Sequence, residues 1–143
     1  MGHAKYLVPI DFSAHSEAAL EYATAFAKDQ DAELLIVHVV EPAIEDLEGV
    51  TQGAAMEGLV AALHERKPSD ESVSYAHRLL QGTPAEAILE VADEESVALI
   101  VMGTHGRRGL NRFVMGSVAE KIVRKAACPV LTIKQPIAAE ATA

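Results

Sequence analysis

The sequence predicts an α/β fold built on one open, five-stranded parallel sheet with helices on both faces. Short, continuous apolar runs alternate strictly with segments of helical periodicity, in the order β-α-β-α-β-α-β-α-β. The runs are rich in β-branched residues and lack polar alternation, which is typical of parallel strands covered on both sides. The 143 residues correspond to one ordinary domain, and no repeat or linker divides them.

Five segments are expected to form the strands. Four of them are buried apolar runs, at residues 6–10, 34–40, 97–102 and 129–133. The fifth, at residues 73–80, is more polar and therefore fits a more exposed edge strand. Right-handed crossovers between parallel strands then place helices on both faces of the sheet.

Apolar residues at helical spacing predict one helix in each gap between strands. The four apolar faces are Ala19, Leu20, Ala23, Phe26 and Ala27; Met56, Leu59, Val60 and Leu63; Ala85, Ile88, Leu89 and Ala92; and Met115, Val118, Ala119, Ile122 and Ala126. Two helices carry start signals. Thr83 and Glu86 form a capping box around Pro84, and Ser117 and Glu120 form a second one.

The remaining segments are expected to be connections and a tail. Residues 41–53 are expected to form a longer, acidic loop that is mobile. Residues 1–135 are expected to form the single domain, followed by a frayed tail at 136–143.

Composition excludes several classes of protein. Twelve basic and 21 acidic residues give a net charge of −9, which disfavours a nucleic acid or an anionic membrane as the partner of the whole surface. The single cysteine, Cys128, excludes an internal disulfide framework and a multi-cysteine metal site. No apolar run approaches the roughly 18 residues of a transmembrane helix, and the chain opens without a signal peptide, so we expect a cytoplasmic protein without membrane insertion.

The most unusual segment follows the third buried run. Glycines stand at 103, 106, 109 and 116 between that strand and the next helix, together with Arg107 and Arg108. Glycine lets backbone N–H groups approach a ligand, and a helix N-terminus attracts phosphate. The segment is therefore either a polyphosphate cradle or a flexible surface loop whose glycines serve turns. Neither a P-loop motif nor G-x-G-x-x-G is present.

The spacing of four of these residues carries a family resemblance. Gly103, Gly106, Gly116 and Ser117 follow G-x2-G-x9-G-[ST], which resembles the nucleotide-binding signature of the universal stress protein family. The resemblance covers nearly the whole chain. It includes the segments Pro9-Ile10-Asp11-Phe12-Ser13, His38-Val39-Val40, Gly82-Thr83-Pro84 and Cys128-Pro129-Val130-Leu131. It implies a Rossmann-like sheet of order 3-2-1-4-5, ATP binding, and homodimers paired through the last strand, at Val130, Leu131, Thr132 and Ile133.

The resemblance also implies the residues of the site. Asp11 is expected to face the adenosine, with Pro9 and Ile10 lining the base pocket and Val39 offering backbone contacts to adenine. Met102 and Gly103 are expected beside the ribose and the phosphates. The phosphates would be held by Gly106, Arg107, Gly116, Ser117 and Val118. Ala119 departs from the pattern, because some ATP-binding relatives carry a hydroxyl residue there, which leaves the number of phosphates held open.

The residues themselves leave alternatives to these roles. Asp11 follows an inner strand, where a carboxylate can accept from ribose hydroxyls, but it could instead be a helix N-cap or turn residue. Ser117 is expected to be an N-cap rather than a ligand, although it could be both, because its N–H can face phosphate while its side chain caps the helix. His105 could donate to a phosphate, although a lone histidine in a loop is more often simply exposed. Arg107 and Arg108 could reach phosphate or solvate the loop.

The sequence gives little support for other catalytic or metal-binding groups of residues. The six histidines show no H-x3-H pair, so no metal site is expected, and no G-x-S-x-G elbow supports a hydrolase serine. His38 lies within an apolar strand and is expected to be a satisfied core histidine. Cys128 is expected to be a buried small hydrophobe at the end of a helix. The acidic cluster of Glu41, Glu45, Asp46 and Glu48 is expected to be a solvated loop, or else a face that binds a partner.

Three functions remain for comparison. The first is an ATP-binding regulatory protein, with Mg²⁺ bound through the phosphates, whose loop order and dimer state are read by a partner such as a membrane transporter or a stress-response protein. The second is a slow ATPase; no carboxylate is obviously placed beside the glycines, so no catalytic residue is expected. The third is a nucleotide-free dimeric scaffold, which the complete glycine pattern disfavours.

Overall fold

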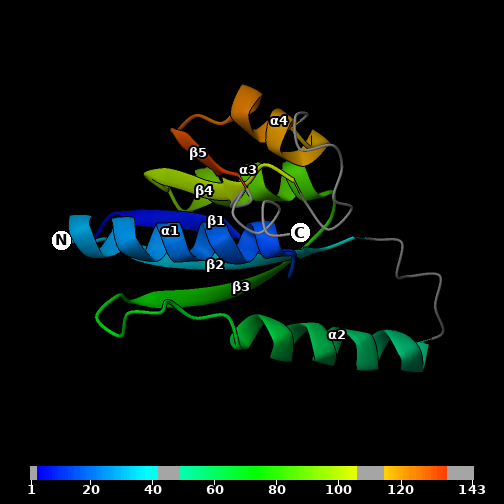
Figure 1. Cartoon of the computed structure of the whole chain (residues 1–143). Coiled ribbons are helices and arrows are strands. Elements are labelled where there is room, and N and C mark those ends of the chain that lie inside the picture. Colours follow the sequence, from blue (N-terminus) through cyan, green and yellow to red (C-terminus); the bar gives the residue numbers. More distant parts are fainter. Residues whose placement is uncertain (1–2, 42–48, 106–114, 135–143) are drawn as a thin grey trace, which may run out of the picture.

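The computed structural model describes residues 3–41, 49–105 and 115–134. Strands and helices alternate along the chain as the sequence predicts (Figure 1). They are β1 Lys5–Pro9, α1 Ala14–Gln30, β2 Glu33–Val40, α2 Gly49–His64, β3 Tyr75–Gln81, α3 Pro84–Glu94, β4 Leu99–Gly103, α4 Ser117–Lys125 and β5 Val130–Ile133.

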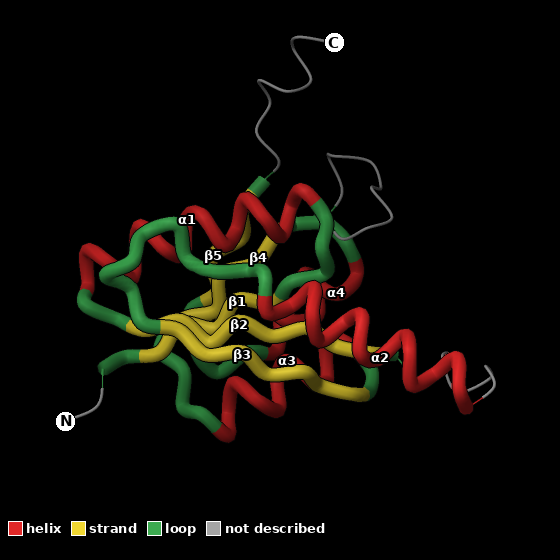
Figure 2. The backbone as a smooth tube through the Cα atoms, turned by 90° about the horizontal axis from the view of Figure 1, so that it is seen from below, coloured by secondary structure: helices red, strands yellow, loops and turns green. Residues whose placement is uncertain are grey.

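The five strands form one parallel sheet of order β3-β2-β1-β4-β5. This is the order that the family resemblance implies, and the more polar β3 lies at one edge as predicted. In the view of Figure 2, α1 lies on one side of the sheet and α3 on the other. The fold is therefore the open, doubly covered α/β sheet that the sequence predicts.

The core has two layers because β1 is buried on both faces. Val8 packs with α1 residues Ala19 and Ala23 on one side, whereas Leu7 packs with Ile88 of α3 and Ile122 of α4 on the other. Both Leu7 and Val8 are fully buried. Apolar runs without polar alternation thus form central strands whose side chains are buried on both faces of the sheet.

The helix starts differ from the predicted capping boxes. Thr83 is the N-cap of α3 and Pro84 follows it, but the Thr83 side chain makes no capping hydrogen bond. Glu86 instead pairs with Lys121 of α4. The prediction that Ser117 caps α4 is wrong, because the N-cap is Gly116 and Ser117 is the first helical residue.

Some apolar residues predicted to face the core are exposed. Phe26 and Val60 lie within their helices but remain 40% and 37% exposed, and Met115 precedes α4 and is also exposed. Helix α2 begins at Gly49, so the predicted 41–53 connection ends earlier than expected. Residues 42–48, with three of the four acids of the predicted cluster, lie outside the described residues, as does the predicted tail.

Cys128 is half-buried in the turn between α4 and β5, not at the helix end, because α4 stops at Lys125. It packs against the core layer under α3 and α4. Burial raises the pKa of its thiol, which keeps it in the neutral form.

Candidate functional site

The order of the strands reverses between β1 and β4, and the candidate site lies where these two strands end. From β1 the chain passes through α1 to β2 on one side, and from β4 through α4 to β5 on the other. In open parallel sheets, ligands bind in the crevice that this reversal leaves beyond the carboxyl ends of the strands. Asp11 follows β1 and Thr104 follows β4, so both lie at this place.

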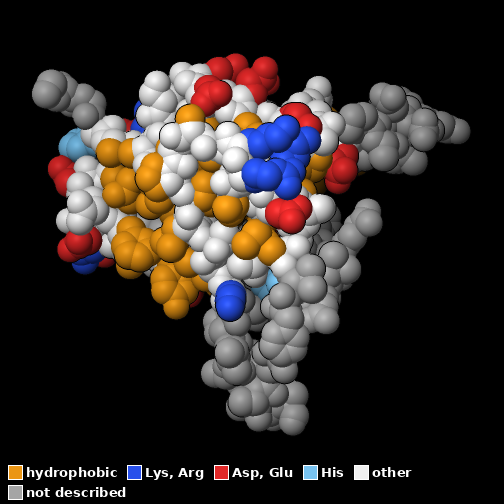
Figure 3. Space-filling view, turned by 90° about the horizontal axis from the view of Figure 1, so that it is seen from above, with side chains coloured by type: hydrophobic (Ala, Val, Ile, Leu, Met, Phe, Trp, Pro, Cys, Tyr) orange, Lys and Arg blue, Asp and Glu red, His pale blue; other side chains and the backbone are white. Residues whose placement is uncertain are grey.

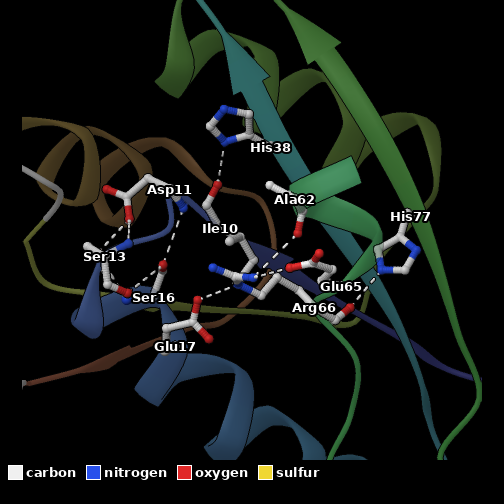
Figure 4. Close-up of polar contacts among 10 residues, drawn as sticks. All are labelled: Ile10, Asp11, Ser13, Ser16, Glu17, His38, Ala62, Glu65, Arg66 and His77. Carbon is white, nitrogen blue, oxygen red and sulfur yellow. Dashed lines mark hydrogen bonds and ion pairs between the residues drawn. The ribbon is translucent and has the colours of Figure 1, made fainter. Parts of the chain in front are cut away.

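Asp11 holds the turn that leads from β1 into α1 (Figure 4). Its Oδ1 accepts hydrogen bonds from the backbone N–H of Ser13 at 3.0 Å and from the Ser13 hydroxyl at 2.5 Å. Ser13 in turn caps α1, because its Oγ accepts from the N–H of Ser16 at 3.2 Å. Asp11 is therefore a turn residue rather than the N-cap. Its second oxygen, Oδ2, makes no hydrogen bond with the described residues and can accept one from a ligand.

The residue next to Asp11 has an unusual backbone. Phe12 has φ +67°, in the left-handed region that a bulky side chain rarely occupies and that costs of order 1–3 kcal/mol. Its ring lies 4.6 Å from the ring of His38, whose Nδ1–H donates to the carbonyl oxygen of Ile10 at 2.7 Å. His38 is 8% exposed, so the prediction of a satisfied core histidine is confirmed.

The end of β4 and the start of α4 are joined by one hydrogen bond. The N–H of Gly116 donates to the carbonyl oxygen of Thr104 at 2.7 Å, and the N–H of Thr104 donates to Ile133 of β5 at 3.1 Å. Gly116 has no side chain to cap the helix, and the N–H groups of Ser117, Val118 and Ala119 lie in its first turn, where helix geometry supplies no partner. The positive end of α4 is thus fixed beside the end of β4.

Gly103 is required by the packing of α1. A Cβ at this position would lie 2.8 Å from the Cβ of His15 and 3.0 Å from its backbone C and O. No side chain fits between β4 and the first turn of α1. The sequence predicts that this glycine lets the backbone approach a ligand, and the structure shows that it also has a packing role.

Two histidines meet beside this contact. The rings of His15 and His105 lie 5.4 Å apart, and Nδ1 of His105 lies 3.0 Å from the hydroxyl of Thr104. His105 is only 7% exposed, so the expectation of an exposed loop histidine is wrong. Nδ1 of His15 is buried and has no hydrogen-bond partner among the described residues. Sequence reasoning missed His15, because no spacing signals a contact that depends on how α1 crosses β4.

The structure separates the predicted base-pocket residues. The pairing of β1 with β2 ends at Pro9 and Val37, so Asp11 follows the last paired residue of β1, and Val39 lies two residues beyond Val37 on β2. Val39, Met102 and Val118 belong to the core layer under α3 and α4, in which Ala119 is also buried. Ile10 is 2% exposed in the opposite layer, so the sheet separates its side chain from theirs. Gly106 and Arg107 lie outside the described residues.

The described ranges offer neither a cluster of metal ligands nor a helix that could span a membrane. Within residues 3–41, 49–105 and 115–134, no group of three His, Cys, Asp or Glu side chains lies close enough to hold a metal ion. In the same part of the chain, no helix has both the length and the apolar character needed to cross a bilayer. The chemistry that the site offers is thus that of one carboxylate oxygen, a buried imidazole nitrogen and a positive helix end.

Comparisons with known proteins agree with this arrangement. Residues 4–134 match the model of the universal stress protein family. Universal stress protein MJ0531 of Methanocaldococcus jannaschii is 37% identical over 142 residues, which cover 94% of this chain and 84% of that one. The solved structure of MJ0577 from the same organism has a TM-score of 0.81 at 28% identity, covering 95% of this chain and 99% of that one.

A second solved structure contains a nucleotide. It is a universal stress protein from Archaeoglobus fulgidus in complex with dAMP. It has a TM-score of 0.64 at 25% identity and covers 94% of this chain and 100% of that one.

Proposed function

Because the chain belongs to the universal stress protein family, we propose that it is a regulatory protein that binds ATP at the crevice between β1 and β4. The nucleotide would lie with its adenosine at Asp11 and its phosphates at the start of α4. Its binding would set the conformation of the 103–116 segment and the state of the dimer, and a partner would read both. The complex of the Archaeoglobus relative with dAMP supports a nucleotide as the class of ligand.

The start of α4 is the observation that carries this proposal. The hydrogen bond from Gly116 to Thr104 fixes the helix end, and no side-chain cap occupies the first-turn N–H groups of Ser117 and Val118. Such groups, together with the positive end of the helix dipole, bind phosphate. Nδ1 of His15, which packs against Gly103 at the same strand end, has no partner among the described residues and adds a polar atom that a ligand could satisfy.

Asp11 is the main residue proposed to bind the adenosine part of the nucleotide. One carboxylate oxygen is committed to the turn at Ser13, which leaves Oδ2 to accept from a ribose hydroxyl. Val39, near the end of the neighbouring strand β2, would offer backbone groups to adenine, and Pro9 would border the base. Gly106 and Arg107 keep the phosphate roles that the family resemblance implies. Mg²⁺ would bind through the phosphate oxygens.

The dimer would form through β5. This strand is an edge of the sheet, and Val130, Leu131 and Thr132 are only half-buried. In the view from above, hydrophobic side chains gather on the face that carries α4 and β5, beside a cluster of Lys and Arg (Figure 3). An exposed hydrophobic edge strand is a liability that pairing with a second copy removes.

The test is titration calorimetry of ATP with Mg²⁺ into protein stripped of nucleotide. Gly116→Glu places a carboxylate at the proposed phosphate site, and Gly116→Ala is its matched control. Both variants add a Cβ that would lie 3.2 Å from the Thr104 carbonyl oxygen, so the alanine control accounts for that contact and leaves the longer, charged end of glutamate as the difference. We expect binding by the wild type and by Gly116→Ala, and none by Gly116→Glu. Absence of binding by the wild type would contradict the proposal.

A further inference from the structure

Phe12 occupies its left-handed conformation between two residues that matter to the site. Asp11 precedes it with its carboxylate in the turn, and Ser13 follows it as the cap of α1. A phenylalanine relaxes from this region unless its surroundings hold it there. Whatever holds the Phe12 ring therefore also sets the direction in which the Asp11 carboxylate points.

Among the described residues, His38 and Arg66 contact the Phe12 ring, which also packs against the core layer on the α1 side of the sheet. His38 contacts it from β2, at a centroid distance of 4.6 Å. The guanidinium carbon of Arg66 lies over the ring at 5.1 Å from its centroid, a cation–π contact. Arg66 follows the C-terminal end of α2, so this contact connects the α2 region to the turn after β1.

Arg66 is itself tightly held (Figure 4). Its Nε donates to Oε2 of Glu17 on α1 at 2.5 Å, and its side chain is 26% exposed. Its carbonyl oxygen accepts from Nε2–H of His77 on β3 at 2.7 Å. Its guanidinium therefore keeps a fixed position over Phe12 instead of sampling solvent. None of these contacts touches the Asp11 carboxylate directly.

We propose that Arg66 is a positioning residue of the nucleotide site: by holding Phe12 in the left-handed conformation, it keeps Oδ2 of Asp11 directed at the ligand. This inference rests on the proposed function, since it assigns Asp11 to the nucleotide. It also makes the affinity for ATP depend on the α2 region, although none of the site residues expected from the sequence lies in that region. Movement of the residues after α2 would release Phe12 and weaken binding.

A simpler role for Arg66 would be to link α1 to the α2 region through Glu17. The two roles differ in their dependence on residue 12. Glycine adopts the left-handed region without strain, so a glycine at position 12 needs no side-chain contact to hold it there. If Arg66 acts through Phe12, removal of its side chain matters only while Phe12 is present. If it acts through Glu17, the effect is the same whichever residue stands at position 12.

The experiment is a double-mutant cycle on ATP affinity with Arg66→Ala, Phe12→Gly and their combination. We expect Arg66→Ala to weaken binding by about tenfold in the wild-type background and by less than about twofold in the Phe12→Gly background. Arg66→Lys keeps the charge but lacks the planar face, and should recover only part of the affinity. Arg78→Ala removes a surface arginine of β3 and is the matched control, with affinity unchanged. Equal losses in both backgrounds would overturn the proposal.

A second readout needs no nucleotide. Hydrogen exchange at the N–H groups of Ser13 and Ser16, which bond to Asp11 and Ser13, reports the turn directly. Arg66→Ala should speed this exchange when Phe12 is present and leave it unchanged when glycine stands at position 12. An exchange rate that Arg66→Ala leaves unchanged in both backgrounds would refute the role of Arg66 in holding Phe12. If the wild type binds no ATP but the exchange rates respond as expected, the proposed function fails. The conclusion that Arg66 orients Asp11 through Phe12 is then retained. Should Phe12→Gly not fold, Phe12→Asn replaces it, because asparagine also tolerates this conformation.

Discussion

Gly116 donates its N–H to the carbonyl oxygen of Thr104 at 2.7 Å, and this single bond brings the start of α4 back to the end of β4. This contact holds the two ends of the connection between β4 and α4 together. The start of α4 therefore lies at the end of β4, and Asp11 follows the neighbouring strand β1, so both lie beyond the strand ends at the reversal of strand order.

Asp11→Asn tests the adenosine end. The asparagine oxygen can still accept from Ser13 and keep the turn, but its second group becomes a donor where a ribose hydroxyl needs an acceptor. We expect ATP affinity to fall by about tenfold or more, since hydrogen bonds to charged groups are worth about 1.5–3 kcal/mol. The melting temperature should change little. Unchanged affinity in calorimetry would remove Asp11 from the site.

Gly103→Ala tests the close approach of α1 to β4. Its Cβ would lie 2.8 Å from the Cβ of His15, and forced overpacking of this kind costs about 1–3 kcal/mol. Gly58→Ala is the control, because nothing lies within 4 Å of a Cβ there and alanine favours helix α2 by about 0.5–1 kcal/mol. Urea unfolding should therefore show opposite signs for the two variants. A neutral Gly103→Ala would mean that α1 can shift without loss.

Leu131→Lys tests pairing through β5. A lysine on a half-buried edge position places a charge where a second copy would pack, so we expect the dimer to dissociate in sedimentation equilibrium. Ala76→Lys puts the same side chain on the exposed opposite edge, β3, and should leave the oligomer intact. A dimer that survives Leu131→Lys but not Ala76→Lys would assign the interface to the other edge.

Asp70 gives a prediction about acid stability. Lys28 at 2.7 Å and the N–H and hydroxyl of Ser72 hold the pKa of Asp70 well below its usual range. A depressed pKa means that the unfolded chain binds the proton more readily. The stabilisation is therefore complete above the unfolded pKa of about 3.9 and is lost as the pH falls toward the folded value.

The matching measurement compares the wild type with Asp70→Asn by urea unfolding at about pH 7 and about pH 2.5. Asparagine keeps an acceptor for Ser72 but has no charge to pair with Lys28. We expect the wild type to be more stable at neutral pH and the difference to shrink in acid. A difference that is independent of pH would show that the charge on Asp70 contributes nothing.

Much of the fold could be predicted because its causes are local. The run around Ile36 is apolar and β-branched throughout, and such a run forms a strand buried on both faces. The polar 73–80 segment likewise belongs at an edge. The strand order, in contrast, came from the family resemblance, since the spacing of apolar runs does not say which strands pair.

The site could be predicted only in part because its geometry is set by tertiary contacts. Ser117 and Glu120 fit a capping box, yet the bond from Gly116 to Thr104 moves the helix start back by one residue. His15 carries no motif, and its place depends on how closely α1 packs on Gly103. The left-handed Phe12 is equally unpredictable, because phenylalanine avoids that region in the absence of the contacts that hold it.

The most direct test of a nucleotide bound between Asp11 and α4 is to record backbone amide NMR spectra while ATP with Mg²⁺ is added. We predict saturable shifts at Val39, Gly103, Ser117 and Val118, at the ends of β2 and β4 and the start of α4, with Ser72 and Val73 unchanged as internal references. Shifts confined to other parts of the sheet, or no shifts at all, would contradict a nucleotide site at the reversal of strand order.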